Sequence, residues 1–383
     1  MKTSGGTRMM GPAAGVMVAA LAAACWASAA LAAEPAPAAP RVSPDGTVHT
    51  LPMDIPPSGL VSPKFKEWYA KWVTNAFEHP TFPIPATRDA PQKEWDALYE
   101  WNEREVVEPL AWVMANYPVD VEDTKLAGVR VGVITPKGGV APGNAKRVLI
   151  NLHGGGFILN PGLSFGKMES APVASLGKIK VITVDYRQAP RHLYPSATED
   201  VVAVYRELLK KYSPGAIGIY GCSAGGALAS QVAAWLQDVK LPRPGAIGVL
   251  CATPGPVIVG GDSLIWAAGA VPATTIPPEV MKAFAPLGWY MSTADAKDAK
   301  AYPGVSDAVM AAFPPTLFLT GTRDPGSGPV YATHARLLAL GVDSFLYVME
   351  GAPHAAHVLG PDTPEARAAN AYIARWFDSH LSH

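Results

Sequence analysis

Seven short β-rich runs follow one another after Gly128, and their alternation with helical patterns constrains the fold more than any other feature of this chain. The runs are VRVGVIT, RVLINLH, IKVITVDY, AIGIYG, AIGVLCA, PTLFLTG and SFLYVMEG. Helical patterns are expected at about 197–212, 223–238, 329–340 and 364–380. Strands that alternate with helices predict an α/β fold with a mostly parallel central sheet and helices on both faces.

The rest of the chain divides by pattern around this alternation. We expect a signal peptide at 1–32, a linker at 33–60, an N-terminal helical cap segment at 61–127, the first part of the core at 128–253, a cap insertion at 254–312 after the strand that ends near Cys251, and the second part of the core at 313–383. The two cap segments are expected to form a lid. Six tryptophans there are candidates either for lining a substrate pocket or for buried packing: Trp68, Trp72, Trp95, Trp101, Trp112 and Trp266.

The N-terminal residues have the pattern of a secretory signal. Lys2 and Arg8 precede an uncharged run at 11–31, and Ala30-Leu31-Ala32 has the small-x-small form of a cleavage site. We therefore expect export to the periplasm or the medium, with no stable membrane span in the mature protein. A membrane span and a lipoprotein modified at Cys25 are the alternatives.

Composition excludes several classes of partner. The chain has 383 residues, 49% hydrophobic and 16% charged, which is enough to bury a large core. Its formal net charge is −1, and no basic run carries interleaved aromatics, so nucleic acid is not expected as a partner. No G-x-G-x-x-G follows the first strand and no histidine cluster has metal-ligand spacing, so neither a dinucleotide cofactor nor a metal is expected. The oligomeric state stays open, a homodimer included.

Ser223 stands in the pentad Gly221-Cys222-Ser223-Ala224-Gly225, where a strand pattern gives way to a helical one. This is a G-x-S-x-G match, in which a tight strand-to-helix turn exposes a nucleophilic serine. A serine at the start of a helix is also a common N-cap. The pentad alone leaves both interpretations open.

The run NLHGGGFILN follows the strand RVLIN and favours the nucleophile. Three successive glycines expose backbone amides, and those of Gly155 and Gly156, with that of Ala224, are the expected oxyanion donors. A flexible loop is the alternative, although ordering a glycine triplet costs entropy. We expect His153 to orient this loop rather than to act as the base.

The segments HGGGF, VDYRQAP and GCSAGG, in this order and spacing, resemble the hormone-sensitive-lipase-like branch of the α/β-hydrolases from about Gly128 to the C-terminus. The resemblance implies a nucleophile, acid and base in the order Ser, Asp, His, with the acid and base after the last two strands. It also implies that 185–187 stabilise a loop beside the active site. Cys222 departs from the acidic residue or threonine that is common before the nucleophile in this branch.

Pattern and resemblance indicate the same acid and base. Asp324 follows the run LFLTG, and His354 follows the run LYVMEG. An aspartate before a proline is also a common turn former. His357 is the reserve candidate for the base, and the carboxylates of Asp295, Asp298 and Asp307 are expected to be solvated.

These residues predict a serine carboxylic-ester hydrolase that acts on small esters with short-to-medium acyl groups through an acyl-enzyme. An amidase or peptidase would use the same groups, and a non-catalytic ligand binder on the same fold is the other alternative. Acyl length and alcohol identity are not encoded in any motif.

Two cysteines remain if cleavage follows Ala32. Cys222 and Cys251 come at the ends of consecutive predicted strands, and an exported protein matures in an oxidising compartment. The sequence therefore allows either a disulfide or two small buried thiols.

Overall fold

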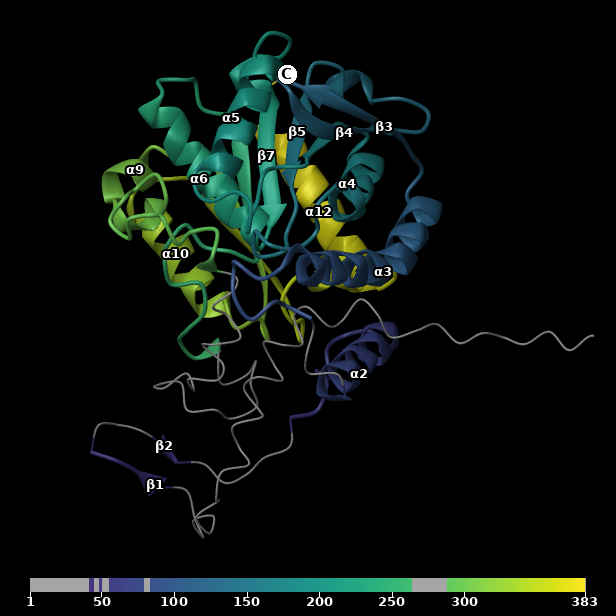
Figure 1. The fold of residues 1–383 in the computed structure, drawn as a ribbon, viewed down its shortest axis with the longest axis vertical. Helices are drawn as coiled ribbons and strands as arrows, with labels where there is room; N and C mark the ends of the chain where they lie inside the picture. Colours follow the sequence, from purple (N-terminus) through teal and green to yellow (C-terminus); the bar gives the residue numbers. More distant parts are fainter. Residues whose placement is uncertain (1–40, 45–47, 50–54, 79–82, 264–287, 383) are drawn as a thin grey trace, which may run out of the picture.

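A computed structural model describes residues 41–44, 48–49, 55–78, 83–263 and 288–382. Its centre is an eight-stranded sheet in the order β10-β9-β8-β7-β5-β6-β4-β3. Figure 1 shows β7, β5, β4 and β3 following one another across this sheet. The strands are β3 Val119–Leu126, β4 Val129–Pro136, β5 Val148–Leu152, β6 Lys180–Val184, β7 Ile217–Cys222, β8 Ala246–Leu250, β9 Thr316–Gly321 and β10 Ser344–Met349. The six strands from β5 to β10 pair in parallel, whereas β3 and β4 are antiparallel, so the predicted α/β fold with a mostly parallel sheet is confirmed.

The parallel strands are apolar because both faces of the sheet are covered. On β5, Leu149 belongs to one hydrophobic cluster while Ile150 and Leu152 belong to the other. This alternation follows the two-residue period of a strand. Each fully buried aliphatic side chain of this kind contributes about 1.5–3 kcal/mol to stability.

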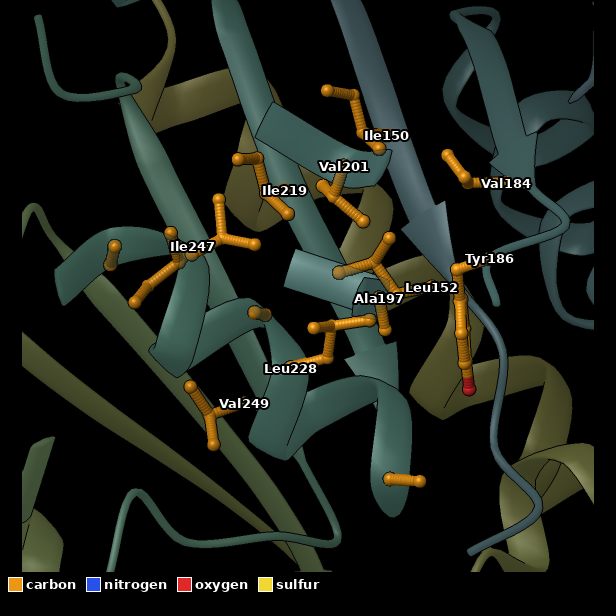
Figure 2. Packing of buried hydrophobic residues seen from close by; sticks show 14 of the residues in the cluster. Ile150, Leu152, Val184, Tyr186, Ala197, Val201, Ile219, Leu228, Ile247 and Val249 are labelled. Carbon is orange, nitrogen blue, oxygen red and sulfur yellow. The ribbon is translucent and has the colours of Figure 1, made fainter. Parts of the chain in front are cut away.

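Five main helices supply the two coverings. Helices α4 Ser164–Gly177 and α12 Pro364–His380 pack in the first cluster, and α5 Ser196–Leu208, α6 Ala224–Asp238 and α10 Ser327–Ala339 pack in the second. Figure 2 shows the second cluster, where Val201 of α5 and Leu228 of α6 lie over the side chains of β5, β7 and β8. The expected helices are therefore present within a few residues of their predicted bounds.

The remaining elements of the described chain include two long N-terminal helices, along with short strands, short helices and 3₁₀ turns. They are β1 Arg41–Val42, β2 Val48–His49, α2 Pro63–Glu78, α3 Gln92–Asn116, α9 Asp307–Ala311, α11 Ala356–Leu359 and three 3₁₀ turns at Pro142–Asn144, Pro214–Ala216 and Pro303–Val305. Strands β1 and β2 pair antiparallel inside the predicted linker.

The sheet begins at Val119, before the predicted core boundary at residue 128. Strand β3 pairs with β4 along its whole length, although the sequence assigned these residues to the helical cap segment. The strand lies at the sheet edge and its residues are mostly exposed or half-buried, so VDVEDTKL lacks the apolar run of a buried strand.

The N-terminal helices pack against later parts of the chain, α2 against the second part of the core and α3 against the described part of the predicted cap insertion. Trp68 of α2 donates its indole N–H to the carbonyl of Leu359 at 3.2 Å, and Trp95 of α3 packs edge to face on Trp289. Trp72 and Trp95 are buried, which favours packing over pocket lining for these two. Trp266 lies in 264–287, the part of the predicted cap insertion that is outside the described residues, so the lid remains a prediction.

Candidate active site

Ser223 lies in the turn between β7 and α6, with φ of 58° and ψ of −121°. A non-glycine residue with this conformation is strained, and such strain persists where the surroundings hold it. Its amide donates to the carbonyl of Leu250 at 2.8 Å, and its carbonyl accepts from the amide of Ala227 at 3.0 Å. Ser223 occupies the N-cap position of α6, but its side chain forms no cap hydrogen bond there. The hydroxyl is half-buried and is not used to cap the helix.

Two glycines make this turn possible because neighbouring backbones approach them closely. A Cβ atom on Gly225 would lie 1.8 Å from the carbonyl oxygen of Leu152, and one on Gly221 would lie 2.1 Å from the same atom. The backbone of β5 cannot move away without breaking the sheet. The G-x-S-x-G pattern is therefore a steric requirement of the turn.

Gly225→Ala is expected to lower the free energy of unfolding by about 3 kcal/mol or more, because overpacking against backbone cannot be relieved by a side-chain rotation. For a chain of this size the melting temperature should fall by roughly 4 °C or more. Thermal unfolding followed by circular dichroism measures both. Gly143→Ala is the control, since nothing lies within 4 Å of a Cβ atom there. Equal melting temperatures for the two variants would contradict the steric argument.

The glycine loop after β5 lies against the serine. A Cβ atom on Gly154 would be 3.6 Å from Cβ of Ser223, and Gly155 and Gly156 have φ of 120° and 62°. Among the described residues, the amides of Gly155 and Gly156 have no hydrogen-bond acceptor. Ala224 is the first residue of α6, where amides lack an intrahelical acceptor. The three expected oxyanion donors are thus on the two turns that meet at Ser223.

Asp324 and His354 form a hydrogen-bonded pair. Nδ1 of His354 lies 3.0 Å from Oδ2 and 3.1 Å from Oδ1 of Asp324. The carboxylate is 1% exposed and also accepts from the amide of Gly326 and the hydroxyl of Thr320. These contacts fix the carboxylate, which in turn favours the imidazole tautomer with its proton on Nδ1.

The environment of His354 also changes its affinity for protons. Burial alone lowers the pKa of the imidazole, but the charge of Asp324 and its hydrogen bond, with a further contribution from Cys251, outweigh burial and raise the pKa to about 9. The imidazole side chain keeps 15% of its surface exposed. It therefore binds a proton more tightly than an ordinary histidine and is still accessible.

The sheet brings the predicted residues to one edge. Ser223 follows β7, Asp324 follows β9 and His354 follows β10, so all three lie beyond the carboxyl ends of parallel strands. The strand order reverses around β5, which has β6 on one side and β7 on the other. Ligands of open α/β sheets bind in the crevice at such a point. Within the described residues, no hydrogen bond joins Ser223 to His354; such contacts often tighten only when substrate is bound.

His153 is placed as a structural residue, as expected. Its side chain is fully buried and stacks on Tyr186 with ring centroids 4.3 Å apart. Nδ1 lies 2.7 Å from the carbonyl oxygen of Gly154, and burial lowers the pKa of the imidazole. Through its contact with Gly154, this buried ring supports the glycine loop.

The loop around 185–187 has the stabilising contacts that the resemblance implies. Asp185 accepts from the amide of Gly162 at 2.9 Å, and Tyr186 donates its hydroxyl to the carbonyl of His153 at 2.6 Å. Arg187 donates from Nε to Asp200 at 2.9 Å. None of the three contacts the Asp324–His354 pair.

The competing carboxylates make local contacts away from this pair. Asp295 and Asp298 accept from backbone amides two residues further along the chain, and Asp307 pairs with Arg336 at 2.6 Å. His357, the reserve base, is 3% exposed and lies 3.9 Å from Sγ of Cys251. Its contact is with a thiol and not with a carboxylate.

Glu169 of α4 is a supporting residue that the sequence analysis did not single out. Its Oε1 accepts the amide of Gly154 at 2.9 Å, and its Oε2 accepts the side-chain amide of Asn151 at 3.0 Å. Burial raises the pKa of this carboxyl to about 8, although these hydrogen bonds act in the opposite direction. Glu169 thus holds the first glycine of the loop beside Ser223. The sequence contains one indication of this role, which is a single acidic residue among the mostly small or apolar residues of FGKMESAP, just before VASLG.

Cys222 and Cys251 are both free and buried in this structure. Their Sγ atoms lie within 4.8 Å of each other. No disulfide joins them in this structure, so they are the two small buried thiols of the two alternatives.

Comparison with known proteins agrees with this geometry. Residues 149–358 match the family model described as alpha/beta hydrolase fold, and the chain belongs to this family. Among curated proteins it is 30% identical over 206 residues to LipR of Mycobacterium tuberculosis, a protein named as an acetyl-hydrolase. The match covers 52% of this chain and 61% of that protein. It is 29% identical over 232 residues to an acetyl-hydrolase of Streptomyces hygroscopicus, covering 58% and 72% of the two chains.

Solved structures give the same class over more of the chain. The structure of esterase E25 superposes with a TM-score of 0.70 at 28% identity and covers 86% of this chain and 98% of that one. An esterase from the bacterial hormone-sensitive lipase family superposes with a TM-score of 0.64 at 26% identity, covering 78% and 95%. The predicted resemblance and the predicted class of carboxylic ester hydrolase are confirmed. In the part of the chain that the structure describes, no helix is long and apolar enough to cross a membrane.

Proposed function

We propose that this protein hydrolyses small carboxylic esters through an acyl-enzyme intermediate on Ser223, with His354 as the base, Asp324 as the group that orients it, and the amides of Gly155, Gly156 and Ala224 as oxyanion donors. The observation that carries the proposal is the Asp324–His354 pair, held at 3.0 Å on the same sheet edge as a strained serine. The acetyl-hydrolase names of two relatives favour short acyl groups.

In the first half of the reaction, Nε2 of His354 takes the proton of the Ser223 hydroxyl while Oγ bonds to the ester carbonyl carbon. The carbonyl oxygen becomes an oxyanion, which the backbone amides stabilise. The carbon–alkoxy bond then breaks, and the alcohol leaves with the proton from Nε2. In the second half, water gives a proton to the same nitrogen and attacks the acyl carbon, and the bond from that carbon to Oγ then breaks as Oγ takes the proton back from Nε2, which releases the carboxylic acid and restores Ser223.

Labelling with a fluorophosphonate tests the nucleophile directly. Oγ of an activated serine displaces fluoride from phosphorus, so we expect one covalent label per chain, located on Ser223 by peptide mass spectrometry. A non-catalytic ligand binder would stay unlabelled, and that result would overturn the proposal. Matched esters and anilides, assayed in parallel over a series of acyl lengths, separate an esterase from an amidase or peptidase.

The rate of hydrolysis is expected to rise with pH through a midpoint above 6.5, the ordinary histidine value. His354 accepts the serine proton only when its imidazole is neutral, and its pKa is raised to about 9, so the protonated, inactive form dominates at lower pH. Below the midpoint kcat/KM should rise roughly tenfold per pH unit. The profile is measured by pH-stat titration of an aliphatic ester, which avoids a chromophore that itself titrates. A midpoint at or below 6.5 would contradict the raised pKa.

Export is a separate proposal that rests on the N-terminal pattern alone. Residues 1–32 and Cys25 lie outside the described residues. We propose cleavage after Ala32, supported by Lys2, Arg8 and the uncharged run that follows them. N-terminal sequencing of the protein recovered outside the cytoplasm should begin at Ala33. A chain that retains Met1, or one that carries lipid on Cys25, would contradict this proposal.

A further inference from the structure

Two thiols and an imidazole lie close together, and one of the thiols belongs to the residue directly before Ser223. Cys222 is the last residue of β7, Cys251 follows the last residue of β8, and His357 lies in α11. They are 2%, 6% and 3% exposed. Their ligand atoms all lie within 4.8 Å of one another, and Sγ of Cys251 is 3.9 Å from Nδ1 of His357. The proposed ester hydrolysis uses none of these three side chains.

This spacing is close to that of a metal site. A tetrahedral cation with bonds of about 2.3 Å to sulfur and about 2.0 Å to nitrogen has its ligand atoms roughly 3.5–3.8 Å apart. The upper limit of 4.8 Å on the observed separations exceeds these values by roughly 1.0–1.3 Å, a difference on the scale of side-chain rotations. The ligand backbones are held by hydrogen bonds from the amide of Cys251 to Leu319 and from the side chain of Asn370 to the carbonyl of His357.

We propose that Cys222, Cys251 and His357 form a binding site for one thiophilic cation of the zinc class. Two thiolates and a neutral imidazole neutralise a divalent ion, so the occupied site carries no net charge into the apolar interior. Thiolate ligands select zinc, cadmium or cuprous ions over magnesium and calcium, which prefer oxygen. Each thiol that becomes a ligand releases its proton to solvent. A water molecule would complete a four-coordinate zinc.

The site would tie together the two segments that carry the proposed catalytic groups. Cys222 directly precedes Ser223, and His357 follows His354 by three residues. A bound cation would therefore hold the turn of Ser223 to the segment of His354 and raise the melting temperature. The three ligands take no part in the proposed ester hydrolysis. A test of the metal site is therefore independent of a test of the proposed function.

Metal uptake by the untagged full chain tests this site. A Cys25→Ser background removes the remaining cysteine, and the protein is reduced with a phosphine and freed of metal with a chelator. We expect one Zn²⁺ per chain in competition with a chromophoric chelator. With Co²⁺ we expect thiolate-to-metal charge-transfer absorption and the visible bands of a tetrahedral ion.

Variants locate the site. Cys251→Ala and His357→Gln should each lower the apparent Zn²⁺ affinity by about a hundredfold or more, since even the loss of an outer partner of a ligand costs 10–100-fold. His334→Gln is the matched control, because the imidazole of His334 is hydrogen-bonded to Ser344 in a different part of the fold. The Zn²⁺ affinity of this variant should equal that of the parent chain. Absence of Zn²⁺ uptake, unchanged uptake in both ligand variants, or a Co²⁺ spectrum without thiolate bands would overturn the proposal. If a ligand variant does not fold, the Co²⁺ spectrum of the parent chain decides.

Discussion

Ser223→Ala is expected to reduce kcat for a p-nitrophenyl ester by at least about 10⁴-fold, because loss of the nucleophile in a serine hydrolase removes the acyl-enzyme route. The residual rate would come from the oxyanion donors and from binding alone. The variant should fold as the parent does. Its amide still donates to Leu250, and alanine meets no more steric strain at φ of 58° than serine does.

Ser230→Ala is the matched control for this variant. Ser230 is a fully buried serine of α6, and its hydroxyl donates to the carbonyl of Ala227 at 2.6 Å. Its loss costs about 1 kcal/mol of stability and leaves the reacting groups in place. Turnover should therefore stay within a few-fold of the parent. A Ser223→Ala protein with more than about a tenth of parental activity would show that another group is the nucleophile.

The sheet was predictable where its strands are buried on both faces. Runs such as VLINL and AIGVL are apolar apart from Asn151 because helices cover both sides, and such runs are visible in a sequence. Strand β3 was not predicted as part of the core, because its alternation of Val119 and Val121 with charged residues is weak at an exposed edge. Pairing with β4, and not local preference, makes it a strand.

The candidate site was predictable where backbone geometry demands a particular residue. Gly221 and Gly225 allow the contact with Leu152, and that demand appears as a motif around Ser223. Glu169 carries no such local signal, since its role depends on α4 packing against the end of β5. The meeting of Cys222 and Cys251 with His357 likewise depends on three separate elements, so spacing along the chain does not indicate it.

Asp324→Asn is expected to lower kcat by about 10⁴-fold, with a much smaller change in KM, because an amide in place of the carboxylate favours the wrong tautomer of the imidazole. Oδ1 of the asparagine can still accept from the amide of Gly326, so the turn is retained. Loss of the negative charge removes the main influence that raises the pKa of His354, so the residual rate should rise with pH at a lower midpoint than in the parent.

Asp307→Asn, which breaks a surface pair with Arg336, is the control and should keep both the rate and the midpoint. If Asp324→Asn retained parental kcat, or lost activity without any shift of the midpoint, the carboxylate would not be the partner of the catalytic base. Because asparagine at position 324 keeps the contact with Gly326, a loss of activity in this variant reflects the charge and not the turn, and Asp307→Asn controls for the loss of a negative charge elsewhere.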